Sequence, residues 1–553
     1  MRDPVKEITD RKQIGTELSP RTRAANIERM RHEVFDLAVI GGGITGAGVA
    51  LDAASRGLTV ALVEKGDFAS GTSSRSSKLI HGGLRYLEQF NFGLVRESLH
   101  ERAVLSRMAP HLSKPLQFLV PVYSSNERSP LGANKLKLAA GLWLYDLLAG
   151  RRNIGRHRWL TREAALDAAP ALEPSGLRGA FVYFDCLTDD ARLVIEVVKA
   201  AAAHGALVAN YIGARGFRED DEGWSAVEVR DSIGAESFEL RARVVVNATG
   251  VWSDEVSQLS DASAPKRLRP SKGIHIVVSS EVLRNRTAVL VPSLGENRFL
   301  FVIPWQGHTL IGTTDTDYKG SLDDPQAAAE EVERVIKSAS HAFPKARLSS
   351  EDVISTFAGL RPLIAANENS TKDISRKEEI FVDKFGLITI TGGKLTTWRK
   401  MGERVADYVT RQLEIRGKDR RLRTRRSITD QLHLAGLATN DDSGSQAERA
   451  AADFNVDPAT VTHLMATYGG NYRVVLEIAS ESESLRTNLV HGLPHIAAEV
   501  LYALRYEMAM TVEDFLARRT RIDLFVRDHG RSCAIQVERL LEREPDWPAI
   551  DRL

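Results

Sequence analysis

The stretch Phe35-Asp36-Leu37-Ala38-Val39-Ile40-Gly41-Gly42-Gly43-Ile44-Thr45-Gly46 decides the fold of this chain. Its first half is mostly apolar and predicts a buried strand, and its second half is a GxGxxG motif. A helix over 47–56 and a second strand over 59–63 are predicted to follow. In this order Gly41 permits a tight turn, Gly43 lets the backbone approach a pyrophosphate, and Gly46 allows close helix–strand packing. The stretch therefore predicts a dinucleotide-binding βαβ unit.

An acidic residue, Glu64, ends the second predicted strand and lies 18 residues after Gly46. A carboxylate at this place accepts hydrogen bonds from the adenosine ribose hydroxyls, and the helix N-terminus offers free N–H groups to the phosphates. An acid disfavours a ribose phosphate and therefore NADP. The motif alone does not separate NAD from FAD.

The next segment, 65–86, does not continue with the helix and strand of a simple NAD-binding domain. It is rich in small hydroxyl residues, among them Thr72, Ser73 and Ser77. Their hydroxyls and the local backbone amides suit a phosphate or a ribityl chain. The alternative is a flexible serine-rich loop.

Composition excludes several classes of function. The 74 Lys and Arg balance the 73 Asp and Glu, so the formal net charge is +1 and no whole-chain basic field for nucleic acid exists. The two cysteines, Cys186 and Cys533, exclude a disulfide scaffold and a cysteine-built metal site, and they favour a reducing, cytoplasmic compartment. We expect no metal. Residues 1–32 lack the apolar core of a secretion signal and predict a polar, solvated extension.

The run 39–88 resembles the flavin-dependent glycerol-3-phosphate dehydrogenases, within the D-amino-acid-oxidase-like FAD superfamily. Later segments resemble the same family in the same order, namely 185–193, 246–250, 272–277, 301–305, 311–315, 359–363 and 392–397. The resemblance covers roughly residues 33–400, and the region from about residue 428 resembles the family's helical cap. The chain lacks the large middle insertion of related oxygen-using glycerophosphate oxidases, which favours a dehydrogenase.

The resemblance and the strand pattern together predict an α/β fold. A Rossmann-like FAD-binding domain, over 33–85, 176–260 and 378–415, is interleaved with a mixed-sheet substrate-binding domain over 86–175 and 261–377. A basic linker over 416–427 leads to a C-terminal all-α cap domain over 428–553. In that domain Ala497, Leu501, Leu504 and Met508 recur at helical spacing.

The resemblance also implies the residues around the cofactor and the substrate. Those around a noncovalent FAD are Gly41, Gly43, Gly46, Glu64, Thr72, Ser73, Ser77, Gly250, Gly393, Lys394, Leu395 and Thr396. Those that bind the substrate are Arg85, Tyr86, Thr313, Arg361 and Lys394. A phosphate favours arginine, which offers forked N–H donors, and lysine as a point charge.

Catalytic roles are implied for Arg361, Lys394 and His275. Arg361 would stabilise the alkoxide that develops at C2, and Lys394 would place positive charge near the flavin N1–C2=O edge. His275 lies in an apolar strand, where a lone histidine is more often a core residue. Only the resemblance makes it the base that accepts the C2 hydroxyl proton, and His81 is its rival.

These assignments imply oxidation of sn-glycerol 3-phosphate to dihydroxyacetone phosphate by hydride transfer to FAD, as part of glycerol catabolism. The electrons would pass to membrane quinone, and the protein would attach peripherally to the inner face of the cell membrane. A homodimer is compatible with the sequence, which leaves the oligomeric state open. The alternatives are an FAD-dependent amine or amino-acid oxidase and a non-catalytic membrane-associated flavoprotein. Arg85, Arg361 and Lys394 carry more charge than a carboxylate substrate needs, and with His275 they argue against both.

A candidate membrane-surface helix lies in 131–152. Leu138, Leu142 and Tyr145 recur at helical spacing and Trp143 adds an aromatic ring, while Lys and Arg residues stand at both ends. An interfacial helix needs this mixture of apolar area, aromatic rings and cations. The alternative is a helix packed inside the substrate-binding domain.

Overall fold

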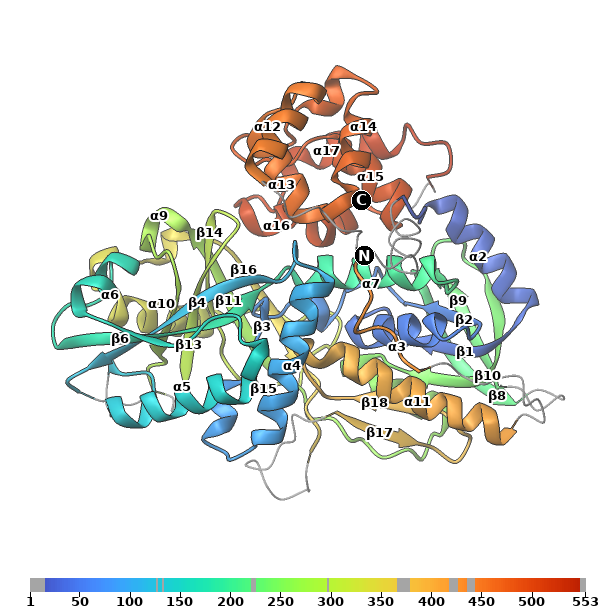
Figure 1. The fold of residues 1–553 in the computed structure, drawn as a ribbon. Coiled ribbons are helices and arrows are strands. Elements are labelled where there is room, and N and C mark those ends of the chain that lie inside the picture. Colours follow the sequence, from blue (N-terminus) through green and yellow to red (C-terminus); the bar gives the residue numbers. More distant parts are fainter. Residues whose placement is uncertain are drawn as a thin grey trace.

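The computed structural model describes residues 15–125, 128–131, 134–219, 225–295, 298–365, 378–416, 426–434 and 443–547. It has two β-sheets, each with helices on its faces, and a helical domain that stands over both (Figure 1). Several predicted segments lie in part outside the described residues: the extension 1–32, the linker 416–427, the C-terminal domain 428–553 and the candidate membrane helix 131–152.

The first sheet is built on the glycine-motif strand. Its strand order is β17 (Glu379–Val382), β18 (Ile388–Thr391), β10 (Ser237–Asn247), β1 (Val34–Ile40), β2 (Val60–Val63) and β7 (Leu207–Ala209), with β8 (Ile212–Glu219) and β9 (Ser225–Asp231) attached through β10. The strands β18, β10, β1, β2 and β7 run parallel. Their apolar runs are buried on both faces, as a sheet with crossover helices requires.

Three helices from distant parts of the sequence pack together beside this sheet. They are α3 (Ile44–Ser55), α7 (Asp190–Ala203) and α11 (Trp398–Arg416). Close contact between α3 and α11 depends on glycine, because a Cβ at Gly402 would lie 2.6 Å from the backbone of Gly48. The Rossmann-like part of the predicted fold is thus confirmed.

The second sheet is mixed, as predicted. Its order is β15 (Thr316–Asp317), β11 (Ser271–Ser279), β14 (His308–Gly312), β13 (Phe299–Trp305), β12 (Ala288–Pro292), β4 (Lys114–Tyr123), β6 (Leu177–Leu187) and β3 (Leu79–Ile80), with β16 (Val353–Arg361) on β11 and β5 (Arg158–Leu160) on β6. The pair β12–β4 is parallel and the other pairs are antiparallel. The helix α5 (Lys135–Ala149) packs on one face of this sheet and α10 (Ala329–Ala342) on the other.

Two strands belong to a different sheet from the one predicted: β3, in the segment 33–85, pairs with β6, and β6 itself also lies in the second sheet. The segment 176–260 was assigned to the FAD-binding domain, but its first strand, β6, pairs with β4 in the second sheet. An extended apolar segment shows that it is a strand and not which sheet it joins, because pairing is decided by long-range contacts.

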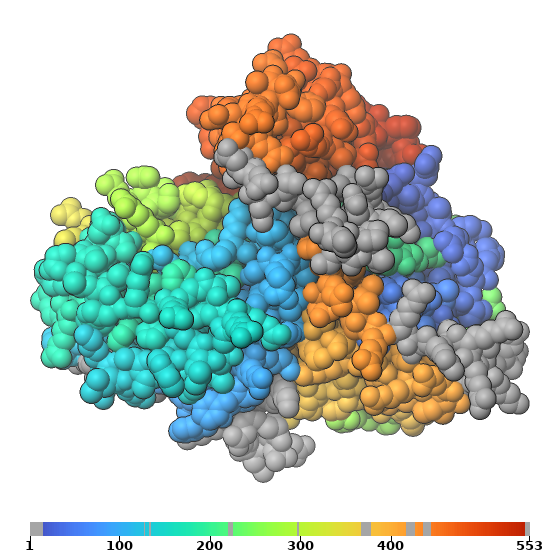
Figure 2. Space-filling view, in the orientation of Figure 1, coloured from blue at the N-terminus to red at the C-terminus, as the bar shows by residue number. Residues whose placement is uncertain are grey.

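The remaining helices cover the sheets or build the C-terminal domain. The first group comprises α4 (Phe92–Met108), α6 (Arg162–Ala168), α8 (Ser253–Ser260) and α9 (Ser280–Leu283). The second comprises α12 (Ser443–Phe454), α13 (Pro458–Tyr468), α14 (Tyr472–Ala479), α15 (Ala498–Glu507), α16 (Ile522–Phe525) and α17 (Arg531–Leu541). The C-terminal helices share an apolar core of their own and form a lobe above the rest of the protein (Figure 2). The residues predicted at helical spacing, Ala497, Leu501, Leu504 and Met508, lie in α15 or at its two caps.

Buried ion pairs join this lobe to the first sheet's domain. Arg519 donates to Asp67 over 2.7 Å, and Arg192 of α7 donates to Glu507 over 2.6 Å, with all four side chains buried. Removing one partner of such a pair leaves a buried charge uncompensated. The lobe is therefore an integral part of the fold.

The N-terminal extension differs from the expectation. Residues 20–32 form the helix α2 (Pro20–His32), capped by Ser19, and Ile27 and Met30 of this helix are buried. Arg23 is also buried and forms an ion pair of 2.6 Å with Asp231. The expectation of a solvated tail is wrong here, because a few apolar positions on one face suffice to dock a polar helix.

Candidate active site

Two neighbouring cavities contain most of the predicted site residues. The first, here called the glycine cavity, has a volume of about 450 Å³ and lies at the carboxyl ends of β1, β2, β10 and β18. Of the predicted cofactor residues it is lined by Gly41, Gly43, Glu64, Thr72, Ser73, Gly250, Gly393, Lys394 and Leu395. The second, the arginine cavity, has about 580 Å³ and is lined by Ser77, His81, Arg85, Tyr86, Thr313 and Arg361 among others.

The motif glycines serve two different purposes. Gly41 has φ +110°, in the region that favours glycine, and it makes the turn out of β1. Gly43 stands at the N-cap of α3 and lines the glycine cavity. Gly46 does not line it, because a Cβ there would lie 1.9 Å from the carbonyl oxygen of Gly41. Its role is close packing of α3 on β1, as the motif predicts.

Glu64 is held by the backbone of the glycine turn. Its carboxylate accepts N–H bonds of 2.6 Å from Gly42 and 2.9 Å from Gly66. Burial raises the pKa of this carboxyl, and the two N–H bonds oppose that effect. The carboxylate is therefore oriented before any ligand arrives.

The hydroxyl-rich segment folds over the same cavity. Ser73 accepts a bond of 3.0 Å from the N–H of Ile44 in the first turn of α3, and Thr72 donates over 2.7 Å to the carbonyl of Leu360. The flexible-loop alternative does not hold for these two residues. Two polar atoms of the wall, Thr391 Oγ1 and Trp252 Nε1, are buried without a hydrogen-bond partner in the described structure. Buried polar atoms of this kind fit a polar dinucleotide such as FAD, which would provide their partners.

Arg361 is fixed at the wall of the arginine cavity. Its guanidinium donates to Thr313 Oγ1 over 2.9 Å and to the Thr314 carbonyl over 3.1 Å, and it contacts Asp315 at 3.3 Å. Asp315 also pairs with Arg298, which lines the same cavity. Thr313, which was predicted to bind the substrate, lies in this wall together with Thr314 and Asp315.

Arg85 differs from Arg361 in its surroundings. It lines the same cavity, and no carboxylate of the described residues forms an ion pair with it. The turn that carries it is held by buried Asp185, which accepts bonds from Gly82 N–H (3.0 Å), Arg102 (2.6 Å) and Tyr145 (2.8 Å). A rigid turn thus presents a guanidinium whose charge is available to a ligand.

Lys394 lies where the two cavities meet. It lines the glycine cavity, and its Nζ is 3.7 Å from the ring centroid of Tyr86, which lines the arginine cavity. Gly393 before it has φ +81°, so the strand-to-helix turn requires glycine there. The ammonium group is therefore close to ligands in either cavity.

His275 lines neither cavity. It is buried, its ring stacks on Phe357 at 4.8 Å, and its Nδ1 has no hydrogen-bond partner among the described residues. Its Nε2 is 2.9 Å from the hydroxyl of Ser77, which does line the arginine cavity. Burial, aided by the charges of Arg361 and Lys78, lowers the pKa of His275 to about 3. Any contact of His275 with a ligand would therefore pass through Ser77.

Three other predictions need refinement. Ser77, predicted beside the cofactor, lines the arginine cavity. Thr396 lines neither cavity, because its hydroxyl is bonded to the backbone N–H and carbonyl of His81. His81 itself lines the arginine cavity, whereas His275 does not.

The sequence reasoning missed Arg298 and Asp185. Arg298 directly precedes β13, but charged residues are common at strand ends and carry no site signal there. Asp185 lies in the first of the later segments that resemble the family, yet its task becomes visible only when Arg102 and Tyr145 are seen beside it.

The comparisons with known proteins agree with this geometry. Residues 36–399 match the family model described as FAD dependent oxidoreductase, and residues 427–552 match the C-terminal domain of alpha-glycerophosphate oxidase. The chain is 39% identical to glycerol-3-phosphate dehydrogenase 2 of Mycobacterium tuberculosis, over 97% of this chain and 89% of that protein. It is 38% identical to the aerobic glycerol-3-phosphate dehydrogenase of Staphylococcus aureus, over 89% of this chain and 88% of that one.

Solved structures give the same result. The glycerol-3-phosphate dehydrogenase of Bacillus halodurans, crystallised with FAD, superposes with a TM-score of 0.76 at 34% identity, over 96% of this chain and 93% of that one. The glycine oxidase of Geobacillus kaustophilus superposes with a TM-score of 0.51 at 23% identity, over 68% of this chain and 95% of that one, and shows a shared fold.

Proposed function

The chain belongs to the family of FAD-dependent glycerol-3-phosphate dehydrogenases, and from this premise we infer that it oxidises sn-glycerol 3-phosphate to dihydroxyacetone phosphate. One observation in the structure supports this substrate most directly. The arginine cavity holds Arg85, without an ion pair to the described residues, beside Arg361, and Lys394 lies at the edge of the cofactor's cavity. That is the charge a phosphate dianion needs, and more than the carboxylate of an amino acid needs.

This function can be tested by adding candidate substrates to the holoenzyme in the absence of oxygen. Glycerol 3-phosphate should bleach the yellow colour of the holoenzyme, whereas glycine and D-alanine should leave it unchanged. Bleaching by the amino acids alone would instead assign the protein to the amine oxidases of the same superfamily.

We propose that Arg85 and Tyr86 bind the phosphate. The phosphate keeps its charge throughout the reaction, so these contacts stabilise the ground state and the transition state equally. Their contribution is to hold C2 at the place where the two cavities meet. Asp185, which fixes the turn before Arg85, acts as a positioning residue.

Arg361 and Lys394 act on charge that changes during the reaction. FAD, when bound in the glycine cavity, supplies the hydride acceptor. Arg361 is held by Thr313 and Asp315 and would stabilise negative charge on the C2 oxygen. Lys394 supplies positive charge at the boundary of the two cavities, where electrons arrive.

The C2 hydroxyl proton requires an acceptor. We propose that it passes to His275 through the hydroxyl of Ser77, which is 2.9 Å from the ring and lines the cavity. Burial, with the charges of Arg361 and Lys78, lowers the pKa of His275, and a dianionic substrate in the arginine cavity would offset part of the effect of those charges. Direct transfer to His81 is the alternative, because His81 also lines the cavity.

We propose that FAD is bound without a covalent bond. Cys186 is fully buried and belongs to neither cavity wall. Acid precipitation should leave the yellow colour in the supernatant, and colour retained in the pellet would contradict the proposal.

We propose that quinone is the electron acceptor and that the protein binds the inner face of the cell membrane at its periphery. No helix among the described residues combines the length and apolar character needed to cross a bilayer. Five exposed apolar side chains lie instead on α5 and at the start of α4: Phe90, Phe92, Leu136, Trp143 and Leu147, here called the apolar patch. Leu136 is 81% exposed, Trp143 60% and Leu147 57%, and they recur at helical spacing on the outer side of α5.

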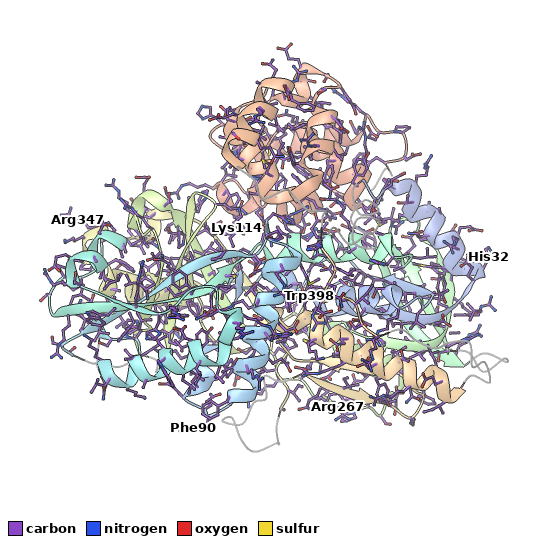
Figure 3. All side chains as sticks on the ribbon, in the orientation of Figure 1. His32, Phe90, Lys114, Arg267, Arg347 and Trp398 are labelled. Atoms are coloured by element: carbon purple, nitrogen blue, oxygen red, sulfur yellow. The ribbon has the colours of Figure 1, made fainter. Side chains whose placement is uncertain are left out.

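The apolar patch has the composition of a membrane-contact surface. Phe90 is 78% exposed and stands at the outer edge of the protein (Figure 3). Its ring centroid is 6.2 Å from that of Phe92, the first residue of α4, and α5 contacts α4. Exposed Arg151 and Arg152 follow α5 and would meet anionic headgroups.

The face of α5 differs from the sequence prediction. Leu138, Leu142 and Tyr145 are buried in the second sheet's core, and only Trp143 of the predicted residues is exposed. One face of the helix packs inward, as the alternative reading of 131–152 predicts, and another faces solvent, where contact with a membrane stays a proposal. A test that replaces Leu142 would remove core packing instead of membrane contact.

The sharper test replaces Leu136, Trp143 and Leu147 with serine. We expect release from the membrane fraction with dye-linked oxidation of glycerol 3-phosphate retained. The matched control replaces three exposed apolar residues elsewhere, Leu259, Phe385 and Ile535, with serine and should stay bound. If the first variant stays with the membranes, or the control is released equally, the apolar patch is not the contact surface.

A further inference from the structure

Ser77 stands in a turn whose two neighbouring residues are held by one buried carboxylate. Asp190 accepts hydrogen bonds from the N–H of Ser76 over 2.9 Å and from its hydroxyl over 2.7 Å, and from Lys78 Nζ over 2.8 Å. The side chains of Asp190 and Lys78 are completely buried. These bonds, here called the Asp190 contacts, fix the residues on both sides of Ser77, whose hydroxyl lies 2.9 Å from Nε2 of His275.

The backbone of this turn needs such support. Lys78 has φ +58°, in the left-handed region that a residue with a Cβ seldom adopts. A conformation of this kind persists only where the surrounding contacts determine it, and it is often found at functional sites. The Lys78 N–H also donates to Ser76 Oγ over 3.0 Å, and its carbonyl accepts from the Thr188 N–H over 2.9 Å. The strain therefore lies directly beside Ser77.

The C-terminal lobe provides a counter-ion for Asp190. Arg521, the N-cap residue of α16, is buried, and its guanidinium pairs with Asp190 and, at 3.2 Å, with Asp189. The two carboxylates thus share Lys78 and Arg521 as buried counter-ions. Because an uncompensated buried charge is unfavourable, the position of Asp190 depends on Arg521 as well as on the turn that carries Ser77.

The same part of the lobe contacts the strand behind His275. Ser355 of β16 donates from its hydroxyl to the carbonyl of Leu524 in α16 over 2.7 Å. Two residues further along β16, the ring of Phe357 stacks on His275. Figure 1 shows α16 at the base of the lobe, above β16. One short segment, 521–525, therefore contacts the supports on both sides of the Ser77–His275 hydrogen bond.

We propose that Arg521 is a positioning residue of the active site, which through Asp190 holds the Ser77 hydroxyl at hydrogen-bond distance from His275. Of the described residues of the C-terminal lobe, none lines the glycine cavity or the arginine cavity. The lobe therefore acts on the reaction through the Asp190 contacts. The proposal rests on the proposed function, in which the C2 hydroxyl proton passes through Ser77. It adds that the C-terminal lobe is needed for this proton transfer and not for binding of the substrate.

The step that depends on this geometry moves one proton. The C2 hydroxyl gives its proton to the Ser77 oxygen while Ser77 gives its own to Nε2 of His275, and the hydrogen on C2 leaves as a hydride to the flavin. The substrate thus loses two electrons and becomes the ketone. A hydroxyl can relay a proton only while both of its hydrogen bonds exist, so displacement of Ser77 should slow flavin reduction and leave substrate affinity unchanged.

The test measures flavin reduction by glycerol 3-phosphate in an anaerobic stopped-flow experiment, which separates the reduction rate from substrate affinity. Arg521→Lys keeps the charge and loses the forked donors that reach both carboxylates. We expect the reduction rate to fall at least tenfold, with FAD content and substrate affinity within twofold of the wild type. The matched control is Arg505→Lys, because Arg505 also belongs to the lobe and pairs with two carboxylates, those of Glu481 and Glu544. It should resemble the wild type.

A double-mutant cycle separates positioning from general destabilisation. Ser77→Ala removes the relaying hydroxyl and should slow reduction by itself. If Arg521 acts through Ser77, the double variant Ser77→Ala/Arg521→Lys should be no slower than Ser77→Ala, whereas independent effects would multiply. Arg521→Lys should also show a larger solvent deuterium isotope effect than the wild type, because proton transfer then limits the rate.

A milder variant covers the case in which Arg521→Lys folds poorly. Ser76→Ala removes the hydroxyl that bonds to Asp190 and to the Lys78 N–H but removes no charge, so the fold should be kept. It should show the same slow reduction with unchanged substrate affinity, and FAD content would be measured because Ser76 lines the glycine cavity.

The outcomes that overturn the positioning role differ from those that overturn the proton path. Wild-type reduction rates in Arg521→Lys or in Ser76→Ala, or effects that multiply in the cycle, overturn the role of Arg521 while slow reduction by Ser77→Ala keeps the path. A wild-type rate in Ser77→Ala shows that the proton path of the proposed function is wrong, and the role of Arg521 is then wrong with it.

Discussion

The glycine cavity and the arginine cavity are adjacent, yet they are built in opposite ways. The glycine cavity is shaped mainly by the backbone, with Gly41 and Gly393 at turns where side chains do not fit. The arginine cavity is shaped by side chains from segments far apart in the sequence, such as Arg85, Thr313 and Arg361. An atom added in the glycine cavity therefore distorts the backbone. A substitution in the arginine cavity removes only the role of the side chain that is replaced.

The largest effect should come from the backbone site. Gly46→Ala places a Cβ 1.9 Å from the Gly41 carbonyl oxygen, where α3 and β1 cannot separate without losing the turn. We expect little or no FAD-loaded soluble protein, since overpacking at such contacts costs about 1–3 kcal/mol or more. FAD content and the thermal midpoint would be measured, with Gly93→Ala as the control. A Gly46→Ala protein with normal FAD content would show that the contact is not needed.

Arg361→Ala should have the next largest effect and should act on turnover. Its guanidinium is proposed to meet charge that develops at C2, so kcat should fall roughly 10²–10³-fold while FAD content stays normal. Steady-state kinetics with a dye acceptor measure this. Arg361→Lys keeps the charge but loses the bonds to Thr313 and the Thr314 carbonyl, and should recover only part of the rate. A kcat within threefold of the wild type for Arg361→Ala would remove Arg361 from the chemical step.

Arg85→Ala should instead raise KM. Loss of a charged hydrogen bond to the phosphate costs about 1.5–3 kcal/mol, which corresponds to roughly a 10–100-fold weaker substrate. The KM for glycerol 3-phosphate should rise with kcat little changed, and glycerol, which lacks the phosphate, should be a poor substrate of wild type and variant alike. If KM stays the same, the phosphate lies elsewhere in the cavity.

The smallest effect concerns the pH dependence of stability. It comes from His275, which lies behind Ser77 at the wall of the arginine cavity. His275 has a pKa of about 3 in the folded protein, below the value of about 6.5 in an unfolded chain. The unfolded state therefore binds the extra proton first as the pH falls. The stability from keeping His275 neutral is complete above pH 6.5 and is lost between about 6.5 and 3, at about 1.4 kcal/mol per pH unit.

Denaturant unfolding of the holoenzyme at pH 7.5 and 5.5, in excess FAD, would measure this loss. His275→Asn should make the loss about 1.4 kcal/mol smaller than in the wild type. His308→Asn is the control, since His308 lies partly exposed at a hairpin turn. An identical pH dependence in wild type and His275→Asn would mean that His275 does not contribute.

The contrast between the cavities also explains which predictions could come from the sequence. The glycine motif, Glu64 and the hydroxyl segment are consecutive or nearly so, and local geometry dictates what each residue does. Gly46 and Glu64 therefore occupy the places that the motif predicts. Thr396 and Ser77 also stand in local motifs, but the direction of a side chain depends on its neighbours, and both point elsewhere than predicted.

The helix α5 shows the same limit. Its sequence contains apolar residues on nearly all sides, so the spacing alone does not tell which stripe packs inward. The second sheet covers Leu138, Leu142 and Tyr145 and leaves Leu136, Trp143 and Leu147 exposed. Likewise, the polar composition of residues 20–32 conceals the apolar face that docks α2.

By itself, then, the sequence determined the dinucleotide-binding unit, the α/β class, the helical C-terminal domain and the charge available to bind a phosphate. The dinucleotide-binding unit follows from short-range rules of backbone conformation, whereas the α/β class, the helical C-terminal domain and the residues that would bind a phosphate were predicted with the help of the family resemblance. Only the tertiary structure decided that Arg85, Arg361 and Lys394 converge at one boundary and that His275 reaches the cavity through Ser77. The physical reason is that convergence depends on contacts between residues hundreds of positions apart, which the folding of the whole chain brings together.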